Sequence, residues 1–104
     1  MNVIKVQTKQ DLLDTISENK QAIKSFGVKS LGIFGSFVKN TYTDTSDVDI
    51  LVEFVTEKKS FDNFMVLAFF LEDLFGRKVE LVTIQSLSKF IGPHILKEVQ
   101  NVSI

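Results

Sequence analysis

Hydrophobic and polar positions alternate most regularly between residues 47 and 54, which predicts a β-strand there. Two shorter stretches, at 30–34 and 79–84, predict further strands by the same criterion. In the 47–54 strand one face is entirely apolar, whereas the other carries three acidic residues. The apolar face is Val48, Ile50, Val52 and Phe54, and the opposite face is Asp47, Asp49, Leu51 and Glu53.

Apolar residues at helical spacing predict three helices around these strands. The first begins at the capping motif Thr8-Lys9-Gln10-Asp11 and extends to Gly27. The second occupies 60–75 and ends at Gly76, and a short third helix begins near Pro93 and runs to residue 99. The order is therefore α-β-β-α-β-α, so we expect a small mixed sheet flanked by helices, in the α/β or α+β class.

Composition narrows the class of protein further. The 104 residues fit one domain, 1–104, with 12 Lys and Arg against 13 Asp and Glu. That balance argues against a basic surface for a nucleic-acid template, and the absence of cysteine excludes thiolate chemistry. The longest apolar run, 64–70, is too short to span a membrane, and residues 1–5 resemble no signal peptide. We therefore expect a cytoplasmic protein without a membrane partner.

Three carboxylates are candidates for metal binding. Asp47 and Asp49 project from the same face of their strand, with Cα atoms about 6.6 Å apart. Side chains at that separation can hold one divalent cation, or two cations, jointly. Glu80 lies on a different strand, in a segment whose pattern indicates burial, where an unpaired carboxylate is costly. If the strands are neighbours, the three acids repel one another and a divalent metal relieves the repulsion. A solvated acidic edge is the alternative interpretation.

The Gly35-Ser36 pair follows the first predicted strand and is a candidate phosphate-binding turn. Glycine lets backbone N–H groups approach a phosphate, and the serine hydroxyl is a further donor. Ten residues separate Ser36 from Asp47. With each of the four residues at roughly 5–7% usage, chance produces the pattern Gly-Ser, ten residues, Asp-x-Asp on the order of once in a thousand such chains.

This pattern resembles the signature of the minimal nucleotidyltransferases of the DNA-polymerase-β-like superfamily. The similarity extends from Leu31 to about Val99 and includes the segments 46–54 and 74–83. It implies a nucleotidyltransferase-like core, in which Ser36 holds the terminal phosphates of a nucleotide with Gly35 and Lys39. It also implies that Asp47, Asp49 and Glu80 are catalytic and bind two Mg²⁺ ions, with ATP as substrate.

The sequence departs from the family pattern at three positions. Lys39 and Asn40 stand where many members have Arg and Gly, and Glu80 stands where a third Asp is commoner. These departures keep an alternative open, in which the protein is a degenerate nucleotidyltransferase that neutralises its partner by binding alone. A purely structural domain is a third interpretation, and it requires the motif spacing to be accidental.

The acceptor of the transferred group must come from another molecule, because the chain has no second domain to hold one. Proteins that resemble this one are commonly antitoxins that adenylylate a HEPN-family toxin, typically on a tyrosine, and they form hetero-oligomers with it. The helix at 61–75 has apolar residues around much of its circumference, which fits either full burial or partial use as a docking face. His94 and Tyr42 carry weaker signals: a surface or capping position for His94, and a loop or nucleotide-site position for Tyr42.

Overall fold

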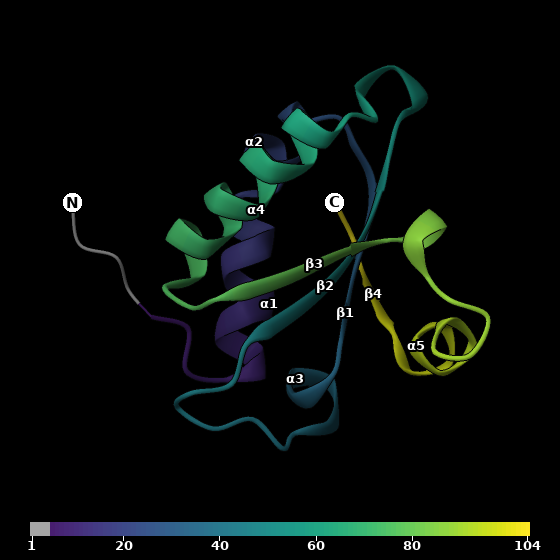
Figure 1. Cartoon of the computed structure of the whole chain (residues 1–104). Helices are drawn as coiled ribbons and strands as arrows, with labels where there is room; N and C mark the ends of the chain where they lie inside the picture. Colours follow the sequence, from purple (N-terminus) through teal and green to yellow (C-terminus); the bar gives the residue numbers. More distant parts are fainter. Residues whose placement is uncertain (1–4) are drawn as a thin grey trace.

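The computed structural model describes residues 5–104, so the expectation about a signal peptide lies partly outside the described residues. Four strands form one sheet in the order β3-β2-β1-β4 (Figure 1). The strands are β1 (Val28–Phe34), β2 (Val48–Phe54), β3 (Val79–Thr83) and β4 (Gln100–Val102). β2 is antiparallel to β1 and parallel to β3, while β4 is antiparallel to β1. The sheet is mixed, which confirms the predicted class.

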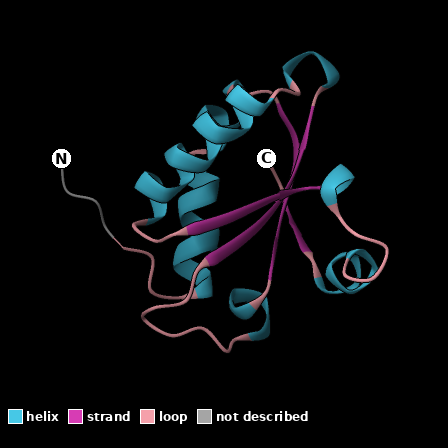
Figure 2. Cartoon of the chain, in the orientation of Figure 1, coloured by secondary structure: helices cyan, strands magenta, loops and turns pink. Residues whose placement is uncertain are grey.

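Helices cover the sheet unequally on its two faces. α1 (Lys9–Glu18), α2 (Lys20–Ser25) and α4 (Phe61–Phe75) gather on one face, and α5 (Gly92–Glu98) lies on the other (Figures 1 and 2). The short α3 (Ser36–Lys39) follows β1 directly, and two 3-10 turns, η1 (Thr56–Lys58) and η2 (Ile84–Ser86), follow β2 and β3. The face away from the long helices is therefore the one on which polar side chains can reach solvent.

The core lies between the sheet and the helices α1, α2 and α4 (Figure 1). The alternating apolar residues of β2 are all buried there, as the pattern predicted. Facing them are buried residues of α1, α2 and α4, which belong to one continuous cluster. These residues are Leu12, Ile16, Ile23, Leu67, Leu71 and Phe75.

The ends of α1 and α4 follow the capping signals in the sequence. Thr8 Oγ1 accepts a hydrogen bond of 3.0 Å from Asp11 N, and Ser60 Oγ accepts one of 3.1 Å from Asn63 N. α4 ends at Gly76, whose φ of 65° is left-handed, the conformation that glycine adopts most readily. The predicted limits of this helix are confirmed.

Two features differ from the sequence prediction. The first predicted helix is broken at Asn19, where φ is −118° and the Asn19 N–H bonds to Ile16 O instead of continuing the α-helical pattern. No glycine or proline stands at this break, and the apolar spacing continues through it. The sequence pattern therefore predicted one helix instead of two. β4 was not predicted, because its three residues show no alternation and its pairing partner, β1, is distant in sequence.

Helix α4 is not fully buried, so the interpretation that places its whole apolar surface in the core is wrong. Phe61, Val66 and Phe69 are 75%, 52% and 58% exposed. We refer to these three exposed apolar side chains as the strip on α4. Within residues 5–104 no helix is long and apolar enough to cross a membrane.

Arg77 connects the start of the chain to the loop before β2. Its Nε donates to Val6 O at 2.6 Å, and its Nη1 donates to Ser46 O at 2.8 Å and Thr43 O at 3.0 Å. The guanidinium also lies over the Phe37 ring, 5.1 Å from its centroid. Because this side chain is buried, its hydrogen bonds are shielded from water, and they fix the loop that leads into Asp47.

We expect Arg77→Met to lower the free energy of unfolding by about 3 kcal/mol or more, because it removes several hydrogen bonds from a charged donor. Urea unfolding measures the change, with Lys78→Met, an exposed neighbour, as the control. Equal stabilities for the two variants would contradict the role given to Arg77.

Candidate functional site

The candidate site lies where β1, β2 and β3 run side by side, on the face away from α4. Asp49 of β2 is in register with Phe34 of β1 and with Glu80 of β3. Residues in register share a face of the sheet, so the Asp49 and Glu80 side chains lie next to each other. Phe34 is followed directly by the Gly35-Ser36 turn. The parallel pairing of β2 with β3 therefore brings residues 31 positions apart in sequence to one place.

Asp49 is the most perturbed titratable group of the site. Burial raises the pKa of Asp49 to about 7, aided by a hydrogen bond shared with Glu80 and by the negative charges of Glu80, Asp47 and Glu98. Neither Asp49 nor Glu80 forms a salt bridge with a basic side chain within residues 5–104. The site thus concentrates negative charge that a cation would stabilise.

The three carboxylates predicted to share a metal are only partly brought together. Asp49 and Glu80 are in contact, and Asp47 is close enough for its charge to raise the pKa of Asp49. In the described part of the chain, however, no three acidic, histidine or cysteine side chains gather in a group that could hold a metal ion. Glu80 is also exposed rather than buried, because β3 is the edge strand of the sheet. The burial argument made for Glu80 from its sequence is therefore wrong.

The Gly35-Ser36 turn requires glycine at its first position. Gly35 has φ 72° and ψ −148°, a region open almost only to glycine. A Cβ built there would overlap the carboxylate of Asp49. The absence of a side chain at Gly35 is what lets the turn lie directly against Asp49.

The helix α3 begins directly after Gly35, and its buried Phe37 anchors it to the core. The ring of Tyr42 stacks on Phe37 at 4.5 Å between centroids and 7° between planes. Asn40 ends α3 with a left-handed φ of 60°. Asparagine tolerates that conformation better than most residues, which explains how Asn40 can replace the glycine of the family pattern.

Glu98, which the sequence analysis did not identify as a site residue, belongs to the site. Its Oε1 accepts a hydrogen bond of 3.0 Å from Gly35 N, and its Oε2 lies 3.2 Å from Lys39 Nζ. The hydrogen bond from Gly35 and the charge of Lys39 hold the pKa of Glu98 below its usual value. Glu98 ends α5, and only the pairing of β4 with β1 brings that helix back to the turn, so no local pattern could have identified it.

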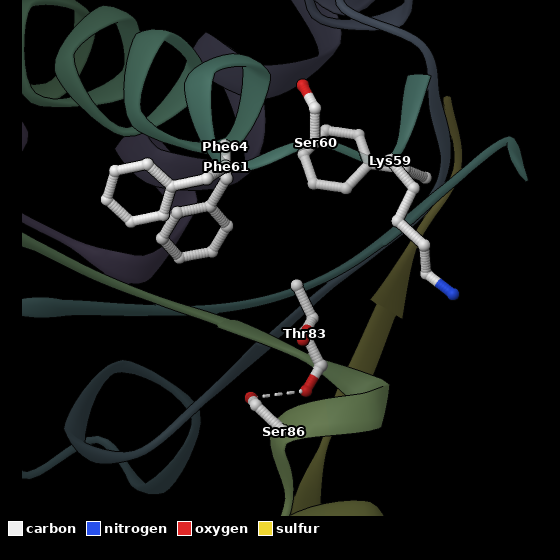
Figure 3. A pocket seen from close by; sticks show the side chains of 7 residues that line it. Lys59, Ser60, Phe61, Phe64, Thr83 and Ser86 are labelled. Carbon is white, nitrogen blue, oxygen red and sulfur yellow. Dashed lines mark hydrogen bonds between the residues drawn. The ribbon is translucent and has the colours of Figure 1, made fainter. Parts of the chain in front are cut away.

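His94 is exposed on α5, as expected for a surface position, and its charge is close enough to Glu98 to help lower the pKa of that carboxyl. A hollow of about 330 Å³ is lined by Phe54, Phe61, Phe64 and Thr83, among others (Figure 3). It lies at the carboxyl ends of β2 and β3, whereas Asp49 and Glu80 are near the starts of these strands. The hollow is thus separate from the candidate site.

Residues 14–102 match the nucleotidyltransferase domain family. Because this match spans most of the chain, the protein belongs to the nucleotidyltransferase domain family. This confirms the class of protein that the Gly-Ser and Asp-x-Asp spacing indicated.

Individual relatives show which members of this family the chain resembles. The chain is 38% identical over 93 residues to the protein adenylyltransferase MntA of Thermococcus cleftensis, covering 88% of this chain and 93% of the relative. The solved structure of a candidate minimal nucleotidyltransferase superimposes with a TM-score of 0.69 at 26% identity, covering 85% of this chain and 93% of the other.

A complex also shares the fold. In a structure of the tri-AMPylated Shewanella oneidensis HEPN toxin with its MNT antitoxin, the matching chain gives a TM-score of 0.64 at 18% identity. The match covers 90% of this chain and 71% of that one. The protein is thus a nucleotidyltransferase with relatives named as protein adenylyltransferases.

The raised pKa of Asp49 predicts how the metal-free protein responds to pH. Folding disfavours the charged carboxylate, so the stability associated with Asp49 is fully present below its unfolded pKa of 3.8. It is lost as the pH rises through the folded value of about 7. Asp49→Asn cannot ionise and avoids this loss. The difference in melting temperature between Asp49→Asn and the wild type should therefore increase from pH 4.5 to about 7 and then level off.

Thermal unfolding with a chelator present, at a series of pH values, measures this difference. Glu57→Gln, at an exposed site on η1, is the matched control. A parallel response of Asp49→Asn and Glu57→Gln would contradict the environment assigned to Asp49.

Proposed function

We propose that this protein is a Mg²⁺-dependent protein adenylyltransferase that moves AMP from ATP to a hydroxyl, in particular a tyrosine hydroxyl, of a HEPN-family partner, and so acts as an antitoxin. The observation that carries the proposal is the contact between the Gly35 turn and Asp49, with Glu80 beside it. A turn that can receive phosphates thereby adjoins carboxylates that can receive a cation. This is the pairing that nucleotidyl transfer requires.

In the proposed reaction, the acceptor oxygen forms a bond to the α-phosphorus of ATP. The bond from that phosphorus to the oxygen shared with the β-phosphate breaks, and pyrophosphate leaves. The proton of the acceptor hydroxyl passes to the Glu80 carboxylate, which is exposed and can release it to solvent. Gly35, Ser36 and Lys39 hold the terminal phosphates, so that the α-phosphate is directed at the carboxylates.

Asp49 and Glu80 lie side by side and fit a divalent metal ion, whereas Asp47 is near them without completing a group of three ligands. The carboxylates of Asp49, Glu80 and Asp47 accumulate charge on one face, and oxygen ligands of this kind suit Mg²⁺. We propose that Asp47, Asp49 and Glu80 hold two Mg²⁺ ions. Such ions neutralise the triphosphate and lower the pKa of the attacking hydroxyl.

Exposed apolar side chains support the proposal that the protein binds a protein partner. The strip on α4 formed by Phe61, Val66 and Phe69 is open to solvent, and Phe90 and Ile91 are 85% and 60% exposed beside α5. Exposed apolar groups of this size are typical of interaction surfaces. The HEPN toxin of the structural relative is the kind of partner we propose, in a hetero-oligomer.

The position of the isotopic label distinguishes this reaction from other uses of ATP. The protein is incubated with its HEPN partner, Mg²⁺ and ATP labelled at either the α- or the γ-phosphate. We expect the partner to take up the α-label and not the γ-label. Uptake of the γ-label would indicate phosphoryl transfer. Uptake of neither, with a stable complex of the two proteins, would favour a degenerate protein that neutralises by binding.

Ser36→Ala tests the phosphate turn. It removes one hydroxyl donor to an anion, an interaction worth about 1.5–3 kcal/mol, so ATP affinity should fall by about 10-fold or more. Isothermal titration with ATP and Mg²⁺ measures the loss, with Ser86→Ala on η2, remote from the turn, as the control. Unchanged affinity of Ser36→Ala would remove Ser36 from the nucleotide site.

A further inference from the structure

The carboxylate of Glu98 joins the C-terminal segment of the chain to both ends of α3. Its two oxygens contact opposite ends of α3: Gly35 N just before the helix and Lys39 Nζ at its last residue. Glu98 itself ends α5, and only Val99 separates it from β4, which pairs with β1. One side chain therefore bridges the C-terminal segment and the phosphate turn.

The hydrogen bond to Gly35 is the contact that matters most for the geometry of the turn. Gly35 has a backbone conformation that few residues adopt, and such a conformation persists only where the surroundings hold it. Asp49 lies against Gly35 on the side where other residues carry a Cβ, and it does not accept the hydrogen bond of the Gly35 N–H. Among the described contacts, the Glu98 carboxylate is the acceptor of that N–H, at 3.0 Å.

The surroundings of Glu98 hold its side chain in place. Gly32 of β1 lets Val99 pack closely against the strand, since a Cβ at Gly32 would come within 2.6 Å of Val99 Cγ2. This packing, together with the pairing of β4 with β1, fixes the end of α5 over the outer face of the sheet. The Glu98 side chain is about a quarter exposed and is directed at α3. The packing of Val99 and the pairing of β4 with β1 therefore fix the position of the Glu98 side chain.

We propose that Glu98 is a positioning residue of the nucleotide site, which acts by accepting the Gly35 N–H hydrogen bond and so fixing the turn that presents the Ser36 hydroxyl. The inference rests on the proposed function, because it assigns the turn to ATP. It assigns the C-terminal helix a part in nucleotide binding, although no residue of α5 belongs to the Gly-Ser or Asp-x-Asp motif. The ion pair with Lys39 is secondary, since both side chains are partly exposed.

Two substitutions separate the hydrogen bond from the charge. Glu98→Gln keeps an oxygen that can accept from Gly35 N but loses the ion pair with Lys39, whereas Glu98→Ala loses both contacts. Lys97→Ala, at the exposed neighbouring position on α5, is the matched control. The dissociation constant for ATP with Mg²⁺ is measured by titration for all four proteins. Hydrogen exchange of the Gly35 amide is followed by NMR in the absence of nucleotide.

We expect Glu98→Ala to weaken ATP binding at least about 10-fold and to lose protection of the Gly35 amide. Glu98→Gln should stay within about 3-fold of the wild type and retain the protection, and Lys97→Ala should match the wild type. Equal ATP binding by Glu98→Ala and the wild type would overturn the proposal. So would tighter binding, which would mean that the carboxylate obstructs the phosphates, or a Glu98→Gln variant as weak as Glu98→Ala. A wild type that fails to bind ATP would instead overturn the proposed function, and this inference with it.

Discussion

Replacing Asp47 and Asp49 together by Asn should reduce AMP transfer by at least about 10³-fold, equivalent to about 4 kcal/mol of transition-state stabilisation. Amides keep the shape of the side chains but remove the charge that would hold Mg²⁺ against the triphosphate. The fold should persist, because Asp49 is disfavoured as an anion in the metal-free protein. The melting temperature of the double variant without metal should therefore equal or exceed that of the wild type.

Glu53→Gln is the matched control for this pair. Glu53 lies on the same strand and the same face as Asp49, but at the far end of β2, where it is near Lys29. Transfer by Glu53→Gln at the wild-type rate would show that loss of a carboxylate from this face is harmless away from the site. A double variant that still modifies its partner at the wild-type rate would contradict the metal assignment of Asp47 and Asp49.

The second large effect is expected at Glu80. Glu80→Gln is nearly isosteric and leaves Asp49 and the Gly35 turn in place, so ATP affinity should stay within a few-fold of the wild type. The transfer rate should fall by at least about 10²-fold, the low end for loss of a general base. Titration with ATP and a single-turnover transfer assay on the same variant measure the two effects separately.

Glu80→Asp is the conservative substitution to compare with Glu80→Gln. It keeps the charge and restores the residue that is commoner in the family, so it should retain activity or raise it. If Glu80→Gln transfers AMP normally, Glu80 has no catalytic part and is merely an exposed residue of an edge strand. If the wild type is inactive and Glu80→Asp restores transfer, the protein acts by binding alone.

Much of the fold could be predicted from the sequence because the signals were local. Strict alternation on β2 gave the buried face correctly, and Ser60 and Gly76 marked the limits of α4 through their capping roles. The spacing of Gly35, Ser36, Asp47 and Asp49 likewise indicated the family without any structure. These features depend on residues close together in the chain, and pattern analysis is suited to them.

The rest depended on pairing between distant segments. That Glu80 is in register with Asp49 follows from the parallel pairing of β3 with β2, which alternation alone cannot specify. Its exposure follows from the position of β3 at the sheet edge. Glu98 was missed for the same reason, because β4 was too short and too polar to predict, yet it returns α5 to the phosphate turn.

The exposed strip on α4 illustrates a further limit. The apolar positions around that helix predicted either burial or docking, and periodicity does not distinguish the two when a helix is apolar on most of its circumference. The packing decides: Leu67, Leu71 and Phe75 are buried against the core, while Val66 and Phe69 are exposed. Only the three-dimensional arrangement shows which part of the helix remains available to a partner.

The central claim is that this protein transfers AMP to a partner protein, and the intact mass of that partner tests it most directly. The purified protein and its HEPN partner are incubated with ATP and Mg²⁺, and the partner is then weighed by mass spectrometry. We predict an increase equal to one or more AMP groups, located on a tyrosine by fragmentation, and no increase with the Asp47→Asn, Asp49→Asn variant. A partner whose mass is unchanged by the wild-type protein, in a complex that nevertheless forms, would contradict the claim.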